Sequence, residues 1–434
     1  MFSKTILVSA LSLAFLVVPA RAQDNPSVDD AARSRVVEGV ARQVEENFYD
    51  SGIGAELAAD LRARLAAGEF DAAGNASRLA EQLTAILHPR DTHFAVRYMG
   101  APPPGGGQGP QGPQGDPLAA ARRANFGFNE VAVLPGNVGY IDMRQFYPAQ
   151  IGGDTALAAL EFIENTDAVI FDMRQNRGGA PSMVQLLISH FLDPASQVPI
   201  NTFLASNREY PGEMISLAYL PGDARPDVPL YVLTSARTGS AGEAFPYHLQ
   251  AMDRATIIGE TTYGAGNPGG FFPAGEGFAV FVSTSRTRNP VTGTNWEGVG
   301  VIPDVDVAAD DALDTALVLA YEAILENVEY PGHRQLLEWS QEEIEARMNP
   351  ASLDETAARD VAGSYGERHI DYVDGNLFYR RGDRSGQRMY PLGEDRFMIE
   401  GVDGYRLTVQ REQGRIVSLT LQQAGGRPRV SIRD

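Results

Sequence analysis

The chain has 434 residues, no cysteine and a formal net charge of −20, from 36 basic and 56 acidic residues. The lack of cysteine excludes disulfides, thiol catalysis and cysteine-ligated metals. The acidic balance, with no basic stripe, argues against nucleic acid or anionic membranes as partners. A chain of this length is expected to fold into two or three domains.

The first 22 residues have the pattern of a secretory signal peptide. Lys4 precedes an apolar run of about a dozen residues, and an A-R-A site ends at Ala22. A transmembrane helix would need about 20 apolar residues, and no later stretch reaches about 18. We therefore expect export to a bacterial periplasm or to the exterior. Cleavage would remove Lys4 and Arg21, leaving 34 basic and 56 acidic residues, a charge of −22, and no lysine.

Residues 29–90 are predicted to form an N-terminal helical lobe. VVEGVARQVEENFYD, AELAADLRARLAAG and SRLAEQLTAIL carry apolar residues at three- and four-residue spacing. HPRDTHFAVRYMG then turns into an alternating strand. Residues 101–117 follow and consist almost entirely of Pro, Gly and Gln. This composition cannot build a core, so we expect a linker or surface flap without a chemical role.

Residues 91–345 are predicted to form an α/β core. Short apolar runs, DAVIFDMRQ and PLYVLTS among them, alternate with helical patterns such as PSMVQLLISHFL and SAGEAFPYHLQAM. This alternation predicts βα units with right-handed crossovers. The pattern changes near Pro350, where alternating strands with D-G-N and E-D turns begin. Residues 350–434 are therefore predicted to form a small antiparallel β-domain, and their sequence offers no clustered nucleophile, base or metal ligands.

Ser240 is the candidate nucleophile. In TGSAGE it lies among small residues at the start of a predicted helix, whose free N–H groups would face a developing oxyanion. The amide of Ala241 would be one such donor. From this stretch alone, a helix-capping serine is the commoner interpretation. The stretch is not a G-x-S-x-G elbow, because Thr238 stands two residues before the serine.

Two further segments offer other parts of a catalytic site. Gly178 and Gly179, in FDMRQNRGGA, follow a predicted strand, where paired glycines let backbone N–H groups line a pocket. A plain tight turn is the alternative for this pair. Glu297, in TNWEGVGVIPDV, is a carboxylate in a Gly-rich turn that would hold an imidazole in one tautomer. A solvated loop glutamate is the alternative there.

A serine nucleophile needs a base, and His93 is the preferred candidate. It directly precedes the FAVRY strand, at the joint between the helical lobe and the core, where it would overhang a cleft. His190 and His248 fall inside predicted helices, where a lone histidine is more often a surface or core residue. The remaining histidines are His88, at the same joint, and His333 and His369, beyond the βα unit.

Together, four ordered motifs resemble the tail-specific (C-terminal processing) serine peptidases, which include the tricorn core protease and the interphotoreceptor retinoid-binding protein repeats. The motifs are D-x-R-x-N-x-G-G, T-S-x-x-T-x-S-A-x-E, I-x-G-E-x-T-x-G and E-G-V-G-V-x-P-D, and the resemblance covers about residues 30–330. It implies a helical N-terminal lobe and a crotonase/ClpP-like ββα core. It also implies that Ser240 is the nucleophile, and that Gly178 or Gly179 forms the oxyanion hole with the Ala241 amide.

The scarcity of lysine bears on the branch of this family. In the Ser-Lys branch the base lies in a G-x-G segment, which here is YGAGNPGG, with Ala265 at that position. The tricorn-like and retinoid-binding-like branch instead uses a histidine from a D-x-H motif and a glutamate from E-G-V-G-V-x-P-D. Residues 91–93 and Glu297 match those motifs. The resemblance therefore implies a triad of Ser240, His93 and Glu297.

The sequence thus predicts an exported serine-type peptidase that cleaves peptide or protein substrates through an acyl-enzyme, with no metal or organic cofactor. The alternative from another class is a non-catalytic protein that binds apolar ligands or peptides, as the retinoid-binding relatives do on this fold. A crotonase-like acyl-CoA enzyme is a further alternative, which export and an acidic surface disfavour. The sequence leaves the oligomeric state open.

Overall fold

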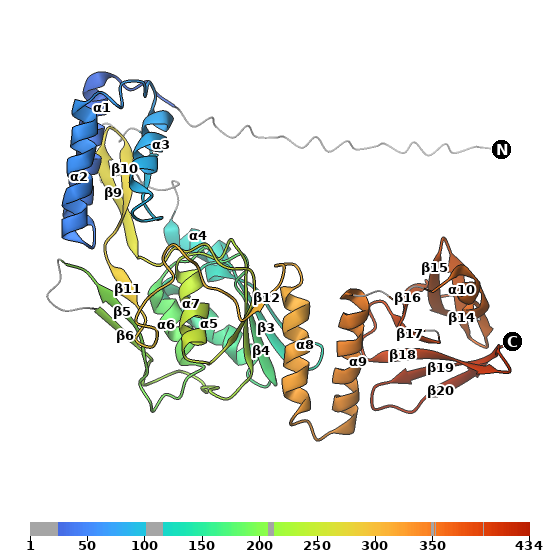
Figure 1. The fold of residues 1–434 in the computed structure, drawn as a ribbon. Helices are drawn as coiled ribbons and strands as arrows, with labels where there is room; N and C mark the ends of the chain where they lie inside the picture. Colours follow the sequence, from blue (N-terminus) through green and yellow to red (C-terminus); the bar gives the residue numbers. More distant parts are fainter. Residues whose placement is uncertain (1–24, 101–115, 207–211, 349–350, 352, 394) are drawn as a thin grey trace, which may run out of the picture.

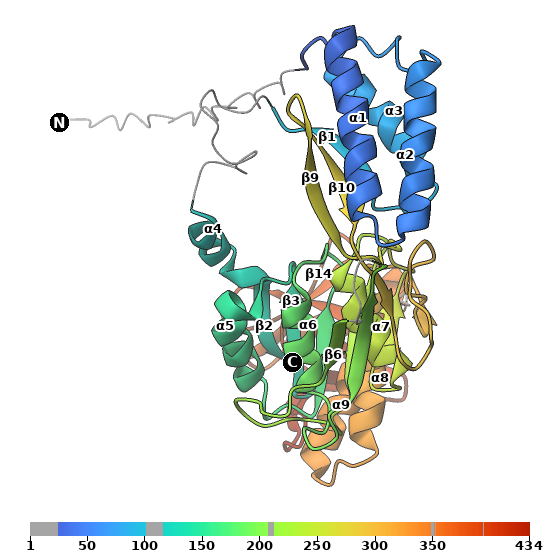
Figure 2. The same ribbon diagram turned by 90° about the vertical axis from the view of Figure 1, so that its left-hand side faces the viewer.

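The computed structural model describes residues 25–100, 116–206, 212–348, 351, 353–393 and 395–434. The predicted signal peptide lies outside these residues, as does the predicted linker up to residue 115. A helical part lies at one end, an α/β body in the middle and a β-rich part at the other end (Figures 1 and 2).

The helical part shares one core with three strands. Its helices are α1 (Asp30–Asn47), α2 (Ser51–Ala66) and α3 (Ala76–Leu87), and its antiparallel strands are β1 (Ala95–Tyr98), β9 (Gly269–Gly275) and β10 (Phe278–Ser283), in the order β1-β10-β9. Val36 and Val40 of α1 pack in the same buried cluster as Val280 and Val282 of β10. The hairpin β9–β10 therefore reaches from the body into the helical part (Figure 2).

A six-stranded mixed sheet forms the centre of the body. Its order is β12-β8-β7-β4-β3-β2, with β2 antiparallel to β3 and the other neighbours parallel. The strands are β2 (Phe128–Leu134), β3 (Val138–Met143), β4 (Ala168–Asp172), β7 (Leu230–Thr234), β8 (Thr256–Gly259) and β12 (Val305–Asp306). Strands β3, β4 and β7 are buried along their whole length, as expected for parallel strands covered on both faces.

Helices cover both faces of this sheet. Alternate strand residues such as Phe171 and Val232 face α5 (Ala149–Phe162), α6 (Pro181–Ser189) and α7 (Ala241–Ala251). The residues between them, such as Ile170 and Leu233, pack in another cluster with α8 (Ala312–Leu325) and α9 (Pro331–Met348). This alternation follows from the two-residue period of a strand.

A second, small antiparallel sheet lies beside the body, in the order β11-β5-β6. Its strands are β5 (Pro199–Leu204), β6 (Gly212–Ile215) and β11 (Arg286–Arg288). A short helix, α4 (Pro117–Arg123), and the turn η1 (Asn125–Gly127) precede the central sheet. Helix α4 begins on the last residue of the segment that we expected to be a linker, where Asp116 caps it and Pro117 occupies its first turn.

The C-terminal part is an eight-stranded antiparallel sheet in sequence order, preceded by helix α10 (Glu355–Val361). Its strands are β13 (Gly363–Tyr365), β14 (Arg368–Val373), β15 (Asn376–Arg381), β16 (Gln387–Pro391), β17 (Arg396–Ile399), β18 (Tyr405–Glu412), β19 (Arg415–Gln423) and β20 (Arg429–Ile432). The expected fold class, α/β with a helical N-terminal region and a C-terminal antiparallel sheet, is confirmed. The domain boundaries stay a prediction. None of the helices in the described ranges has the length and apolar character needed to cross a membrane.

Candidate active site

Five of the six residues predicted from the sequence as site residues meet in or beside one cavity. Its volume is about 250 Å³, and His93, Gly179, Ser240 and Ala241 line it. Glu297 contacts the ring of His93 from outside the lining. The cavity lies between α6, α7, the loop at 265–268 and the small sheet. Segments far apart in the sequence therefore converge on it.

Ser240 lies between β7 and α7 in a strained backbone conformation. Its φ of 56° and ψ of −124° are sparsely populated for any residue with a side chain. Such a conformation costs about 1–3 kcal/mol and persists only where neighbouring contacts impose it. Strain at a candidate nucleophile is consistent with a functional role, since strained residues cluster at active sites.

Glu243 is the contact that holds this turn, and the sequence analysis assigned it no role. It is fully buried, and one carboxylate oxygen accepts hydrogen bonds from the Ser240 amide at 2.7 Å and the Ala265 amide at 2.8 Å. The other oxygen accepts bonds from the Gly264 amide at 2.6 Å and the Thr262 hydroxyl at 2.5 Å. Burial raises the pKa of Glu243, and these four donors oppose that rise. Glu243 is the last residue of the S-A-x-E motif, and this motif was the sequence signal from which a role for it could have been predicted.

The two candidate glycines of the oxyanion hole differ in their hydrogen bonds. The Gly178 amide donates to the Asn176 side chain at 2.8 Å, so this amide is already engaged. Within the described residues, the amides of Gly179 and Ala241 donate to no protein acceptor, and both residues line the cavity. Gly178 instead packs under the nucleophile, because a Cβ added there would lie 2.7 Å from Ser240 Cβ.

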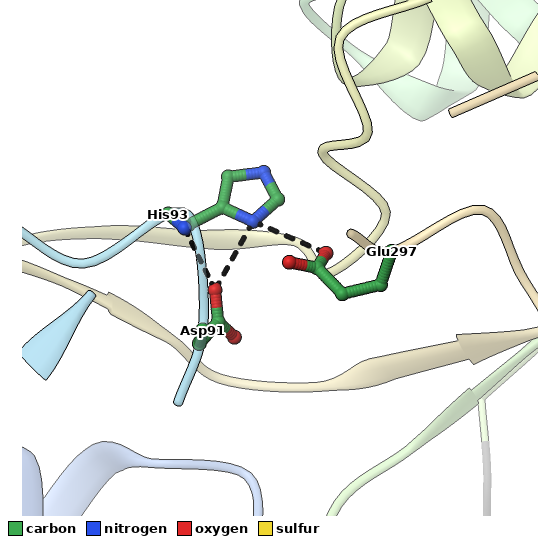
Figure 3. A group of neighbouring side chains, drawn as sticks. All are labelled: Asp91, His93 and Glu297. Carbon is green, nitrogen blue, oxygen red and sulfur yellow. Dashed lines mark hydrogen bonds and ion pairs between the residues drawn. The ribbon is translucent and has the colours of Figure 1, made fainter. Parts of the chain in front are cut away.

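His93 faces two carboxylates through the same ring nitrogen (Figure 3). Its Nδ1 lies 3.3 Å from Asp91 Oδ1 and 3.4 Å from Glu297 Oε2, and Nε2 points away from both carboxylates. Neither contact has the alignment of a hydrogen bond, so we treat them as ion pairs. Among the described residues, no hydrogen bond joins His93 to Ser240; the two side chains share the cavity.

These contacts change how His93 titrates. Burial by itself would lower its pKa, but Asp91 and Glu297 outweigh burial and raise the pKa of His93 to about 9. Burial would raise the pKa of Asp91, yet the nearby His93 ring and the His93 amide, which donates to Asp91 Oδ1 at 2.8 Å, hold it below its ordinary value. The ring is thus oriented by two anions and poised to hold a proton.

Glu297 is fixed by donors from two segments. Its Oε1 accepts the Thr92 hydroxyl at 2.7 Å, and its Oε2 accepts the amides of Gly266 at 2.7 Å and Asn267 at 3.0 Å. The histidine motif and the loop that carries Ala265 therefore both bind the same carboxylate. Sequence analysis gave neither Asp91 nor Thr92 a role, although both belong to the D-x-H motif that it singled out.

Asp91, His93 and Glu297 could also be considered as metal ligands. Within the described ranges, they are the one group of His, Asp and Glu side chains whose donor atoms are close enough to bind a metal ion. These atoms lie within 4.8 Å of one another. However, both oxygens of Glu297 already accept hydrogen bonds from the protein. The arrangement therefore suits orientation of an imidazole better than ligation of a metal.

Comparison with known proteins finds similarity to one family of peptidases over part of this chain. Residues 137–307 match the model of peptidase family S41. A carboxy-terminal-processing protease of Bartonella bacilliformis is 28% identical over 180 residues, 40% of this chain and 39% of that protein. A carboxyl-terminal-processing protease of Synechocystis sp. is 32% identical over 174 residues, 39% of this chain and 38% of that protein. The aligned segments thus span less than half of these relatives.

Among solved structures, a photosystem II D1 C-terminal processing protease is 23% identical, with a TM-score of 0.32 over 41% of this chain and 45% of that one. The resemblance to tail-specific peptidases that the motifs suggested is confirmed by the family model and these relatives. The tricorn-like and retinoid-binding-like branch stays a prediction.

Proposed function

We propose that the protein is a serine peptidase with Ser240 as nucleophile, His93 as general base and Glu297 as the group that orients His93. The match of residues 137–307 to the model of peptidase family S41 supports this proposal. The observation that carries the proposal is the shared cavity: Ser240 and His93 line it together, and Glu297 holds the far side of the imidazole. Asp91 orients the ring as well.

The reaction would begin with attack of Ser240 Oγ on the carbonyl carbon of a peptide. His93 Nε2 takes the serine proton, and the resulting imidazolium is stabilised by the two carboxylates at Nδ1. The oxygen that becomes negative would accept hydrogen bonds from the amides of Gly179 and Ala241, at the start of α7. We prefer Gly179 to Gly178 because the Gly178 amide already donates to Asn176.

The tetrahedral intermediate then collapses, and His93 returns the proton to the leaving amine. This leaves an ester between Ser240 and the acyl part of the substrate. Water attacks that ester with His93 again as the base, which releases the acid and restores the serine. Each step uses groups of the chain alone. We further propose that the protein is exported, on the basis of residues 1–22, and that it acts on peptides or proteins outside the cytoplasm.

A fluorophosphonate probe followed by peptide mapping tests the proposal, because such probes react only with activated serines. We expect labelling at Ser240 in the wild type, and none in Ser240→Ala or in His93→Ala. A library of peptides should then reveal cleavage, with kcat/KM lowered by about 10⁴-fold or more in either variant. The intact mass of the processed protein should correspond to a chain that begins at Gln23.

A folded wild-type protein that stays unlabelled would contradict the proposal. That result would favour a protein that binds apolar ligands or peptides in the same cavity without cleaving them. Circular dichroism of both variants serves as the control for folding, because neither residue lies inside a helix or strand.

A further inference from the structure

The inner part of the cavity is a built pocket beside the candidate nucleophile. Asn201 and Phe203 are two residues apart on β5 and so lie on one face of the small sheet. Their cross-strand partners, Met214 and Thr287, also line the cavity. The opposite wall comes from α7, where His248 lies two turns beyond the helix start. One face of the sheet and one face of the helix therefore enclose the space.

Most of this wall is apolar and, apart from His93, none of it is ionisable near neutral pH. The apolar lining includes Pro181, Val184, Phe203, Met214, Ala244, Phe281 and Trp296. Among the residues that the structure describes, no Asp, Glu, Lys or Arg lines the cavity. A charged side chain placed here would lose its hydration and find no lining partner except His93, whose ring already faces Asp91 and Glu297, and burial of an unpaired charge is costly.

Asn201 is a polar exception in this wall. Only 3% of its surface is exposed, and its side-chain oxygen Oδ1 has no hydrogen-bond partner among the described residues. Oδ1 itself is covered by protein atoms, so a half-turn of the amide about χ2, which exchanges Oδ1 and Nδ2, is needed to present the oxygen to the cavity. Buried polar side chains are normally hydrogen-bonded, so a ligand group that donates to the turned amide would satisfy it.

Two other polar residues of the wall, Asn267 and Thr287, donate to protein acceptors. His248 is a further polar residue of the wall, and its tautomer is determined by its neighbour. The Asn289 side chain accepts the amides of Val291 and Thr292 through Oδ1, so its Nδ2 must be the atom 2.9 Å from His248 Nδ1. His248 Nδ1 therefore accepts, and the ring proton of neutral His248 lies on Nε2. Burial lowers the pKa of His248 to about 3, so the ring is neutral in the ordinary pH range.

We propose that this cavity binds the substrate side chain on the acyl side of the scissile bond, and that it selects a carboxamide, glutamine or asparagine. The inference rests on the proposed peptidase function. The NH₂ group of a carboxamide would donate to Asn201 Oδ1, and its oxygen would accept from His248 Nε2–H. The methylene groups would contact the apolar wall.

Other classes of side chain lack one part of this match. An aliphatic side chain fills the apolar space but leaves both buried polar groups unpaired, which costs binding free energy. A carboxylate or ammonium brings a charge, and among the described lining residues only His93 can be charged near neutral pH, where Asp91 and Glu297 already pair with it. The pocket therefore discriminates by hydrogen-bonding capacity as well as by size.

The test is a series of peptides that differ only in the residue on the acyl side of the cleaved bond: Gln, Asn, Leu, Met, Glu and Lys. We expect kcat/KM for Gln or Asn to exceed that for Leu or Met by at least about tenfold, the effect of one or two hydrogen bonds. Asn201→Leu, which keeps the shape but removes the amide, should abolish or reverse that preference. His248→Phe should likewise weaken the preference for Gln and Asn over Leu and Met.

Two controls separate this proposal from the function on which it rests. Thr202→Val changes the other face of β5 and should leave the order of substrates intact. Fluorophosphonate labelling of Ser240 should occur in all of these variants, since none alters the triad. Labelling with an aliphatic preference in the wild type, or a carboxamide preference that survives Asn201→Leu, would overturn the pocket assignment alone. Absence of labelling in the wild type would overturn the peptidase function itself.

Discussion

At the scale of single residues, the unusual feature is a histidine whose Nδ1 faces two carboxylates. In a Ser-His-acid triad one carboxylate suffices to fix the tautomer and to stabilise the imidazolium. Here both Asp91 and Glu297 lie within 3.4 Å of His93 Nδ1. The second anion strengthens the proton affinity of the ring. The base is thereby more effective once neutral, but it becomes neutral only at higher pH.

This arrangement predicts an alkaline pH profile. A general base must be neutral, so kcat/KM should rise with pH until the raised pKa of His93, about 9, is passed. Glu297→Gln removes one of the two charges, so the midpoint of the profile should move toward the ordinary value of 6.5, and the plateau should fall by at least about tenfold. Peptide cleavage measured from pH 5 to 10.5 checks both expectations.

The matched control is Glu276→Gln. Glu276 is a half-exposed glutamate in the turn of the hairpin β9–β10 that pairs with Arg35, and its change should leave the profile unchanged. Linkage adds an independent check on stability. Because the folded pKa of His93 is raised, its charge stabilises the fold fully below pH 6.5, and this contribution disappears as pH rises through about 9. Glu297→Gln should therefore destabilise the protein more at pH 6 than at pH 9.5. An equal loss at both would contradict the account.

At the scale of elements, the hairpin β9–β10 links the helical part to the candidate site. It starts directly after the loop that binds Glu297, and it pairs with β1, which follows His93 after one residue. Helix α1 packs so closely on β9 that a Cβ at Gly39 would lie 2.0 Å from the Ala274 carbonyl oxygen. The position of His93 relative to Glu297 therefore depends on how α1 seats the hairpin.

Gly39→Ala tests this dependence. The added methyl must push α1 and β9 apart, so we expect a loss of about 1–3 kcal/mol in the free energy of unfolding. A drop in kcat/KM should accompany it, because His93 and Glu297 would separate. Urea unfolding and peptide cleavage provide the two measurements.

Gly153→Ala is the matched helical control, since the nearest atom to its new Cβ, Leu186 Cδ2, is 3.9 Å away. Alanine is the better helix former, so this variant should gain up to about 1 kcal/mol and keep full activity. If Gly39→Ala were equally harmless, the close packing of α1 on β9 would not control the site.

At the scale of the whole molecule, a buried ion pair joins the C-terminal sheet to the body. Arg406 of β18, whose side chain is 3% exposed, lies 2.5 Å from Glu343 of α9 and also donates to the Trp339 carbonyl. Its guanidinium lies 5.0 Å from the centre of the Trp339 ring. The chain has two tryptophans, Trp339 and Trp296. The fluorescence of Trp339 reports on the contact between α9 and the C-terminal sheet, and that of Trp296 reports on the cavity.

Arg406→Met should destabilise the sheet more than the site. It leaves the largely buried Glu343 without its cation, and such a loss typically costs about 3–5 kcal/mol. In a Trp296→Phe background, unfolding followed by Trp339 fluorescence should show an earlier midpoint. In the Arg406→Met variant that keeps Trp296, fluorophosphonate labelling of Ser240 under native conditions should equal that of the wild type.

Arg396→Met is the control, because Arg396 pairs with Glu342 of the same helix but is 47% exposed, and its loss should cost less than about 1 kcal/mol. Equal effects of the two variants would show that burial of Arg406 does not matter. A loss of Ser240 labelling in Arg406→Met would instead show that the sheet and the site unfold together.

Much of this organisation was predictable because it depends on local pattern. The two-residue and three-to-four-residue periods predicted the α/β body, the N-terminal helices and the C-terminal sheet. The hairpin β9–β10 and the small sheet of β5, β6 and β11 were not predicted. Strand β9 is rich in glycine, and β6 and β11 have only 4 and 3 residues, too few to show a period. Short strands of this kind form because distant segments bury one of their faces.

The sequence by itself determined which chemistry was available. It contains no cysteine, and its single lysine is Lys4, so a thiol mechanism is excluded, and a Ser-Lys dyad is excluded in any chain that has lost its first 22 residues. Motif order was enough to nominate Ser240, His93 and Glu297. How these groups are held depends on contacts between remote segments. Asp91 lies beside His93, the Gly178 amide is engaged, the Gly179 amide has no acceptor among the described residues, and Asn201 and His248 line one cavity. Hydrogen-bond partners and burial arise from contacts between remote segments, and a linear pattern does not encode them.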